Sequence, residues 1–429
     1  MTRPLTRRLT SRRPAGGADG RLSGNRDFLI MSSGNGLSQV GTAAAGMVLP
    51  LTVLHSTGST LWVGAVEAVW AASLGLACVP AGPIVDRFDR GTVLMICDAG
   101  RALASAALAL ASLDGRPPVW ILLSVGVVLG FLGAPSNAAV LASLRQLVPG
   151  SRLSAAVSVT LGRIQAANLI GPIAGGFLFS VSPSAPFWFN ACSFVISGVC
   201  VFAVRRSLRA TPATGSRFLN DLTAGFRFVW RERLQRTCLL TTMALGLILQ
   251  GILLLVILVN AQRGASGPSV GFIVSAATAG ALVGTVLAPI AGDRFPPVRL
   301  VMGATAVTGC LVVVMTTARD RIALAALLAL AMVVMSIAGS VLTTTRLLRT
   351  PDDFQGRVNS VFHLTQFAAA LGPTMAGLML DRLSGGTGLL IFAGLLWALT
   401  LLLARLKVPA PEAAAGSPDP DAPAPGGRA

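Results

Sequence analysis

The stretch from Gly82 to Arg101, GPIVDRFDRGTVLMICDAGR, decides the fold of this chain. Two acids and two arginines fall within the five positions Asp86–Arg90. The apolar run before them, Leu61–Val85, carries a single acid, Glu67. Because charges at this density cannot lie in hydrocarbon, the stretch predicts a tight turn that joins two membrane helices.

The composition supports a membrane protein. Hydrophobic residues make up 53% of the 429 positions and charged residues 12%, and the mean hydropathy is +0.72. Ordinary soluble domains carry roughly 25% charged residues. The net charge of +17 does not indicate a nucleic-acid partner, because the basic residues lie between apolar runs and at the N-terminus.

Apolar runs of spanning length recur along the chain. They predict twelve helices, over 28–54, 60–85, 92–113, 119–144, 155–181, 186–204, 237–261, 268–290, 300–318, 322–344, 358–381 and 388–405. The expected fold class is therefore an all-α membrane protein, with one six-helix bundle over 28–204 and a second over 237–405.

Arginine placement sets the expected orientation. With both termini in the cytoplasm, about 27 Arg and Lys residues fall in cytoplasmic segments and about five fall outside. Residues 1–27 and 406–429 are expected to be disordered cytoplasmic tails. Two Arg-Arg pairs in the first tail also fit a twin-arginine signal, but the apolar run that follows is longer than such a signal allows.

The segment 205–236 is polar and basic and joins the two predicted bundles. Four apolar positions recur in it at helical spacing, namely Phe218, Leu222, Phe226 and Val229 or Trp230. This pattern predicts an amphipathic helix on the inner leaflet, with its arginines towards anionic headgroups.

The two halves of the sequence repeat. LRQLVPGSRLSAAVSV precedes Gly171-Pro172, and LLRTPDDFQGRVNSV precedes Gly372-Pro373, about 200 residues later. An even number of spans between the copies gives both the same orientation, so a parallel repeat about an axis normal to the membrane is expected.

The pattern Gly-x-x-x-Asp-Arg-x-x-Arg from Gly82, with twelve spans and a six-plus-six repeat, resembles the major facilitator superfamily of transporters. DRFDRGTVLMICDAGRAL, FWFNACSFVIS and AGFRFVWRERLQR further resemble bacterial drug and siderophore exporters of the macrolide-efflux and enterobactin-exporter kind. The chain departs from the family at Gly91, where a basic residue is usual. It also departs at Pro135-Ser136-Asn137, and no acid stands at the cytoplasmic end of the fourth helix.

The resemblance implies a gating motif in and after the charged turn. It comprises Gly82, Asp86, Arg87, Arg90, Asp98 and Arg101. In the family such residues help to lock the cytoplasmic face in the outward-open state. Asp86 is expected to cap a helix of the other half near Arg357, and Asp98 to pair with Arg87 or Arg90. Gly82 is expected to allow close helix packing.

Glu67 is the one carboxylate well inside a predicted span. An ionised acid is costly there, which makes Glu67 a candidate for proton coupling or for binding a cationic substrate. A structural hydrogen bond and a position at the outer rim remain the alternatives.

Polar residues at helical spacing are candidate contacts for a substrate cavity. They are Asn35, Gln39, Arg163, Gln165, Asn168, Gln250, His363 and Gln366. Arg163 fits a place near the cytoplasmic mouth equally well. Hydrogen bonds between helices are a common alternative for all of them, and the favoured one for His363 and Gln366.

The predicted function is secondary active export of amphipathic small molecules such as drugs, antibiotics or siderophores, by proton antiport. The alternatives are an importer or lysolipid flippase of the same fold, or a membrane sensor or scaffold that transports nothing. No enzyme motif is recognisable, and no cofactor or metal site is expected from scattered cysteines and two distant histidines. We expect a monomer in the bilayer, with small substrates and protons as partners. A single lysine, no tyrosine and abundant alanine suggest a bacterial inner membrane.

Overall fold

The computed structural model describes residues 25–204, 218–318, 320–351, 354–355, 358, 361–362 and 365–405. Its first bundle holds six helices: α1 (Arg26–Thr57), α2 (Thr60–Arg87), α3 (Arg90–Ala111), α4 (Val119–Leu147), α5 (Leu153–Val181) and α6 (Ala185–Phe202). The next helix is α7 (Phe218–Arg231), followed by α8 (Arg233–Gln262), α9 (Gly267–Arg294), α10 (Pro297–Thr317), α11 (Arg321–Leu348), α13 (Thr365–Arg382) and α14 (Gly385–Arg405). The predicted tails lie outside the described residues, except for 25–27 at the start of α1.

Eleven of the described helices are long and apolar enough to cross a membrane. The predicted span over 358–381 corresponds to α13, which is not among the eleven. Its 18 described residues end with the charged pair Asp381-Arg382, which lowers the hydropathy of this short helix. The predicted all-α membrane fold is confirmed, and α13 takes the fifth place in the second bundle.

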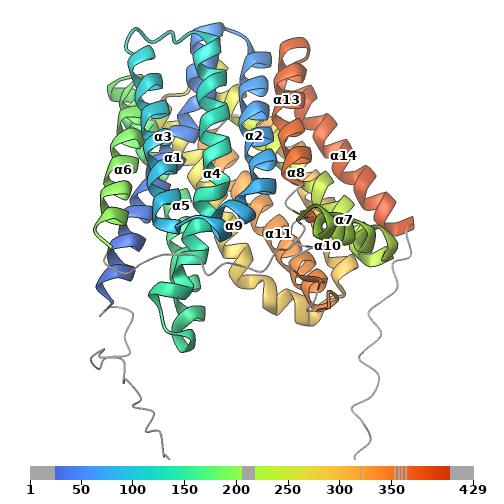
Figure 1. The fold of residues 1–429 in the computed structure, drawn as a ribbon. Coiled ribbons are helices and arrows are strands. Elements are labelled where there is room, and N and C mark those ends of the chain that lie inside the picture. The colour runs from blue at the N-terminus through green and yellow to red at the C-terminus, as the bar shows by residue number, and fades with distance from the viewer. Residues whose placement is uncertain are drawn as a thin grey trace, which may run out of the picture.

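Helix contacts repeat between the two halves (Figure 1). In the first half α1 packs on α5 and α6, α2 on α4, and α3 on α6. In the second half α8 packs on α13 and α14, α9 on α11, and α10 on α14. Each pair in one bundle therefore has its counterpart in the other, as the internal repeat predicts.

Both chain ends leave the described fold on the same side, which is the lower side in Figure 1. We call this side, where α1 begins and α14 ends, the terminal face. The opposite side, where α1 ends at Thr57 and α2 begins at Thr60, is the distal face.

Two glycine contacts join the bundles near the distal face. In the α2–α13 seam, a Cβ added at Gly64 would lie within 3.0 Å of Pro373 O, and one at Gly377 within 3.0 Å of Thr60 O. The Thr60 hydroxyl donates to Gly377 O at 2.9 Å. Such close backbone approach requires residues without side chains.

The second contact is the α5–α9 seam. A Cβ added at Gly176 would lie within 3.0 Å of Gly267 O, and one at Gly271 within 3.0 Å of Pro172 O. Gly176 and Gly377 each lie five residues after a Gly-Pro pair of the sequence repeat. The two seams are therefore related by the internal repeat.

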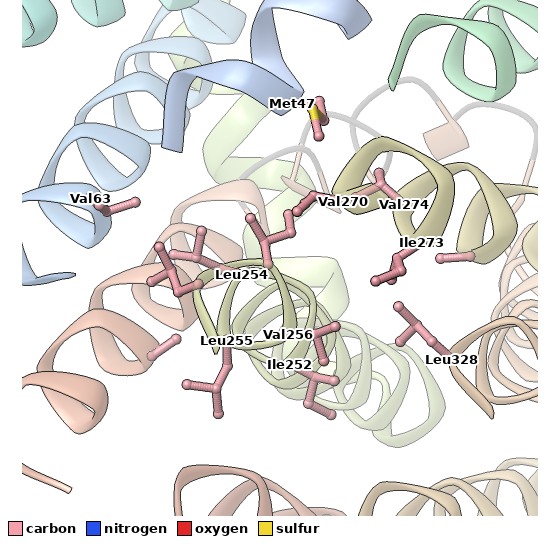
Figure 2. Close-up of a cluster of buried hydrophobic side chains, with 14 of the residues drawn as sticks. Met47, Val63, Ile252, Leu254, Leu255, Val256, Val270, Ile273, Val274 and Leu328 are labelled. Carbon is pink, nitrogen blue, oxygen red and sulfur yellow. The ribbon is translucent and has the colours of Figure 1, made fainter. Parts of the chain in front are cut away.

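Apolar side chains fill the space between the two seams. Figure 2 shows Met47 and Val63 of the first bundle beside Leu254 and Val270 of the second, and all four belong to one buried cluster. Val63 and Val270 are completely buried. The seams and this apolar plug together seal the distal face.

The described contact between α2 and α13 does not extend to the terminal end of α2. Gly82 lies five helical turns after Gly64, so both glycines occupy the same side of α2. Backbone atoms of α13 lie close to Gly64, whereas a Cβ added at Gly82 would meet nothing within 4 Å. Among the described residues, the structure is thus closed on the distal face.

Helix α7 lies at the terminal face against the second bundle (Figure 1). Val229 is fully buried in a cluster with Cys238, Leu239 and Val361. The Phe228 ring stacks on Phe354 at 4.9 Å between centroids. This contact fixes one side of α7 to the protein.

The predicted apolar stripe of this helix divides between two sides. Phe226 and Trp230 stack on each other at 5.4 Å and are about half exposed, on a different side from Val229. The difference arises because positions 226 and 230 are one turn apart, whereas 229 projects about 60° away from 226. The side chains of Phe218 and Leu222 lie outside the described residues.

We expect Val229→Asp to lower the melting temperature of the purified protein by several degrees. The substitution places an ionisable group among buried apolar side chains. Arg227→Asp is the control, because Arg227 is exposed on the same helix. Equal melting temperatures for the two variants would show that α7 does not dock through Val229.

Candidate functional site

The charged turn is shorter than the sequence suggests. Asp86 and Arg87 form the last turn of α2, and Asp89 is the N-cap of α3. The Asp89 carboxylate accepts a hydrogen bond from the Thr92 backbone at 2.9 Å, which satisfies a free N–H at the helix start. Only Phe88 and Asp89 therefore separate the two helices.

The gating candidates of this turn differ in their contacts. Arg90 donates to the carbonyl of Ala142 on α4 at 3.3 Å, which ties the turn to its own bundle. Asp86 and Arg87 are exposed, and no described residue of the second bundle pairs with them. The helix that Asp86 is expected to cap begins near Arg357, and Arg357 lies outside the described residues. Gly82 is also exposed, and no described residue lies within 4 Å of a Cβ added there.

Asp98 and Arg101 belong to a different environment from the turn. Both are buried, with 3% and 7% of their surfaces exposed. Ser197 of α6 hydrogen-bonds the Asp98 carboxylate, and Arg101 is the cation beside it. The expected pairing of Asp98 with Arg87 or Arg90 is not observed, because Asp98 lies two turns into α3 on the side that faces α6.

Arg101 links three helices of the first bundle. Its guanidinium lies 4.1 Å above the Phe194 ring of α6 and donates to the Thr42 hydroxyl of α1 at 3.3 Å. A cation over an aromatic face inside a membrane bundle is stabilised by the ring and by the neighbouring carboxylate. In this structure the pair holds α1, α3 and α6 together rather than contacting the charged turn.

Glu67 lies one turn from the α2–α13 seam. It is three positions after Gly64 and is partly buried. Leu76 is 60% exposed and lies on the lipid side of α2. About two and a half turns separate Glu67 from Leu76, so the carboxylate projects to the opposite side, between the bundles.

Three further candidates lie on α1 and α5, which both contact the second bundle. Asn35 and Gln39 are partly exposed and share one side of α1 with Gly46, where an added Cβ would meet nothing within 4 Å. Asn168 is exposed on α5. It lies one turn before Gly171, which contacts α1, and Pro172, which contacts α9.

Gln250 is exposed on α8, the helix of the second bundle that corresponds to α1. These polar groups of α1, α2, α5 and α8 are partly or fully exposed and lie on helices that meet between the bundles. We call Asn35, Gln39, Glu67, Asn168 and Gln250 the interbundle polar residues.

Arg163 does not join this set. Its guanidinium donates to the Ser32 hydroxyl, and its side chain packs against Gly36, so it fastens α5 to α1. Gln165 is partly buried on the same helix. His363 and the side chain of Gln366 lie outside the described residues.

Sequence reasoning missed the residues of the two seams. The sequence did contain a signal for them, because Gly176 and Gly377 each follow the glycine of a repeated Gly-Pro pair by five residues. It also missed Arg346, which is buried near the terminal end of α11 and resembles an ordinary arginine at the end of a span.

The curated relatives with similar sequences are transporters. An uncharacterized MFS-type transporter, YfiS of Bacillus subtilis (strain 168), is 29% identical over 232 residues, which are 52% of this chain and 54% of YfiS. The enterobactin exporter EntS of Escherichia coli O1:K1 / APEC is 23% identical over 193 residues, 45% of this chain and 46% of EntS. The chain thus spans about half the length of the curated relatives it matches.

A solved structure supports the fold. The nucleoside transporter NupG, as its D323A mutant, has a TM-score of 0.74 over 89% of this chain and 100% of its own, at 14% identity. At that identity the likeness shows the fold alone. The family model of the Major Facilitator Superfamily matches residues 31–366 and 239–426. The chain therefore belongs to the Major Facilitator Superfamily of transporters.

Proposed function

We propose that this transporter is a secondary active exporter of amphipathic small molecules, driven by the inward flow of protons across a bacterial inner membrane. In this proposal the terminal face is cytoplasmic, because it carries most of the arginines. The observation that carries the proposal is the position of Glu67, a carboxylate between the bundles and one turn from the distal seal.

The conformation supplies the first half of an export cycle. In the proposed cycle, cargo enters from the cytoplasm while the distal face is sealed, and it reaches the interbundle polar residues. Opening of the two seams then releases cargo on the other side, where protons are more abundant. Protonation of Glu67 from that side makes its return through the apolar interior less costly than the return of an ionised carboxylate.

The chemistry of the interbundle surface supports mostly apolar cargo. The interbundle polar residues carry four amides and one acid, and they lie beside an apolar plug. The similarity to EntS over about half its length favours export and a siderophore-like cargo. Similarity to NupG concerns the fold and carries no argument about direction.

Cellular accumulation tests the proposal. A bacterial host without its own major efflux pumps is to express the protein or its Glu67→Gln variant at equal membrane levels. We expect the wild-type protein alone to lower the intracellular level of at least one amphipathic antibiotic or siderophore in a panel. Higher accumulation in cells with the wild-type protein would instead identify an importer. Equal levels for every compound would contradict export of this cargo class.

We expect Asp86→Asn to abolish export while membrane insertion is unchanged. Asp86 is exposed in the state that is sealed on the distal face, so its charge is available to bind the second bundle when the terminal face closes. Asp114→Asn is the control, because Asp114 is an exposed acid on the opposite face. Export at the wild-type rate by Asp86→Asn, at matched protein levels, would remove Asp86 from the gating machinery.

A further inference from the structure

Helix α7 carries an exposed surface beside the side that docks on the second bundle. Phe226 and Trp230 stack on each other with 47% and 48% of their surfaces exposed. Arg227 and Arg231 are also exposed. We call these four residues the α7 patch. Because they lie within two turns of one helix, they form a continuous surface.

The turn of the helix separates the two kinds of side chain in the patch. Successive residues are about 100° apart around an α-helix, so Arg227 and Arg231 each follow an aromatic residue by about 100°. Val229, which is fully buried against the second bundle, lies about 60° from Phe226 and about 160° from Arg227. The arginines therefore point away from the docked side, and the aromatic pair lies between the two.

The arginine pair is available to an anion. No described residue forms a hydrogen bond or an ion pair with Arg227 or Arg231. The acid that follows in the sequence, Glu232, lies about 100° around the helix from Arg231 and about 140° from Arg227. Side chains four positions apart on a helix are neighbours, so both guanidinium groups can reach one phosphate.

The place of α7 in the fold puts the patch at the level of lipid headgroups. Only Glu232 separates the end of α7 at Arg231 from the start of α8 at Arg233. Helix α8 is long and apolar enough to cross the membrane, and α7 lies beside its terminal end (Figure 1). Tryptophan is enriched at membrane–water interfaces, and amphipathic helices with arginines and aromatic residues bind there.

We infer that the α7 patch binds a phospholipid with a net negative headgroup. Arg227 and Arg231 hold the headgroup phosphate, and the stacked Phe226 and Trp230 rings lie against the glycerol and the first acyl carbons. The lipid fastens α7 to the leaflet at the terminal face, and Val229 passes this restraint to the second bundle. The inference goes beyond the proposed export and depends neither on its direction nor on Glu67.

The test uses the purified full-length protein, stripped of lipid in detergent, at constant ionic strength. The readout is the concentration-dependent rise in melting temperature that accompanies binding to the folded state. We expect phosphatidylglycerol to bind roughly tenfold or more tightly than phosphatidylcholine with the same acyl chains. Glycerol 3-phosphate keeps the anion without the chains, and we expect it to give no rise at the same concentrations.

Arginine variants place the anionic lipid on α7. We expect the double change of Arg227→Gln and Arg231→Gln to remove the preference for phosphatidylglycerol, and the same change to Lys to retain most of it. The matched control is the double change of Arg294→Gln and Arg299→Gln, because these arginines are exposed at the terminal ends of α9 and α10. The control should keep the wild-type preference. Without lipid, all these variants should melt as the wild type does.

Aromatic variants test the apolar half of the patch. We expect Trp230→Ala to weaken the binding of both phospholipids. Trp120→Ala should leave the binding unchanged, because Trp120 is 67% exposed at the opposite end of the first bundle, where α4 begins.

Three results would overturn the inference. The first is equal binding of phosphatidylglycerol and phosphatidylcholine to the wild-type protein. The second is a loss of preference in the α9–α10 control as large as in the α7 variant, which would indicate a diffuse basic surface. The third is a rise with glycerol 3-phosphate equal to that with the lipid, which would assign the arginine pair to a soluble anion.

Discussion

Glu67→Gln is expected to abolish uphill, proton-driven export while downhill exchange of the same cargo continues. Glutamine keeps the size and hydrogen-bonding capacity of the side chain but cannot titrate. Holding an ionised carboxylate at the centre of a span costs roughly 2.5–3.5 kcal/mol, and less near the rim. A transporter that moves this carboxylate between two environments therefore depends on gaining and losing a proton.

The measurement is transport in proteoliposomes with and without an imposed pH gradient. Exchange of labelled for unlabelled cargo reports binding and conformational change. Accumulation of cargo in response to the pH gradient reports coupling. Glu67→Asp keeps a titrating group one methylene shorter and should retain part of the uphill transport. If Glu67→Gln still concentrates cargo in response to the gradient, coupling belongs to another acid. Asp98, a buried acid on α3 beside Arg101, is then the next acid to test.

Gly176→Val is expected to open the distal face and stop uphill transport. Every atom beyond Cα at this position meets the backbone of Gly267 and Pro268, which cannot move aside as a flexible side chain can. Overpacking of this kind costs typically about 1–3 kcal/mol, which is roughly a tenfold or larger shift between two conformations. The substitution therefore destabilises the conformation in which the distal face is sealed.

A cysteine at Val63 reports the opening. Val63 is completely buried in the plug between the bundles, so Val63→Cys is protected while the seal is closed. The six native cysteines are first replaced, and labelling by a membrane-impermeant maleimide is followed from the distal side. We expect roughly tenfold faster labelling with Gly176→Val. Gly394→Val is the control, because a Cβ there meets nothing within 4 Å, and equal rates for both would show that the seam is no seal.

The large-scale features of the fold were predictable because they depend on composition. Runs of apolar residues broken by charged turns locate helices wherever a bilayer is the solvent. The repeated Gly-Pro pairs indicated the relation between the bundles. The end of the second helix was less predictable, since α2 continues for two residues, to Arg87, and Asp89 caps α3 through its side chain.

The candidate site was predictable in its residue types more than in their contacts. Glu67 and Asn168 stood out as polar residues inside apolar runs, and their roles stay predictions. The contacts of Arg163 and Asp98 could not be predicted from local sequence, because their partners lie on other helices. These partners are Ser32 of α1 for Arg163 and Ser197 of α6 for Asp98. The seams arise from helices distant in the sequence, so their geometry appears only after the bundles pack.

Proton movement during cargo transport tests proton-driven export most directly. The protein is reconstituted in proteoliposomes with its terminal face outwards, with a pH-sensitive dye inside and no initial gradient. Addition outside of a cargo found in the accumulation assay is expected to raise the internal pH, because cargo enters as protons leave. The Glu67→Gln protein should show no change. A fall in internal pH on cargo entry, or cargo entry without any pH change in the wild-type protein, would contradict proton-driven export.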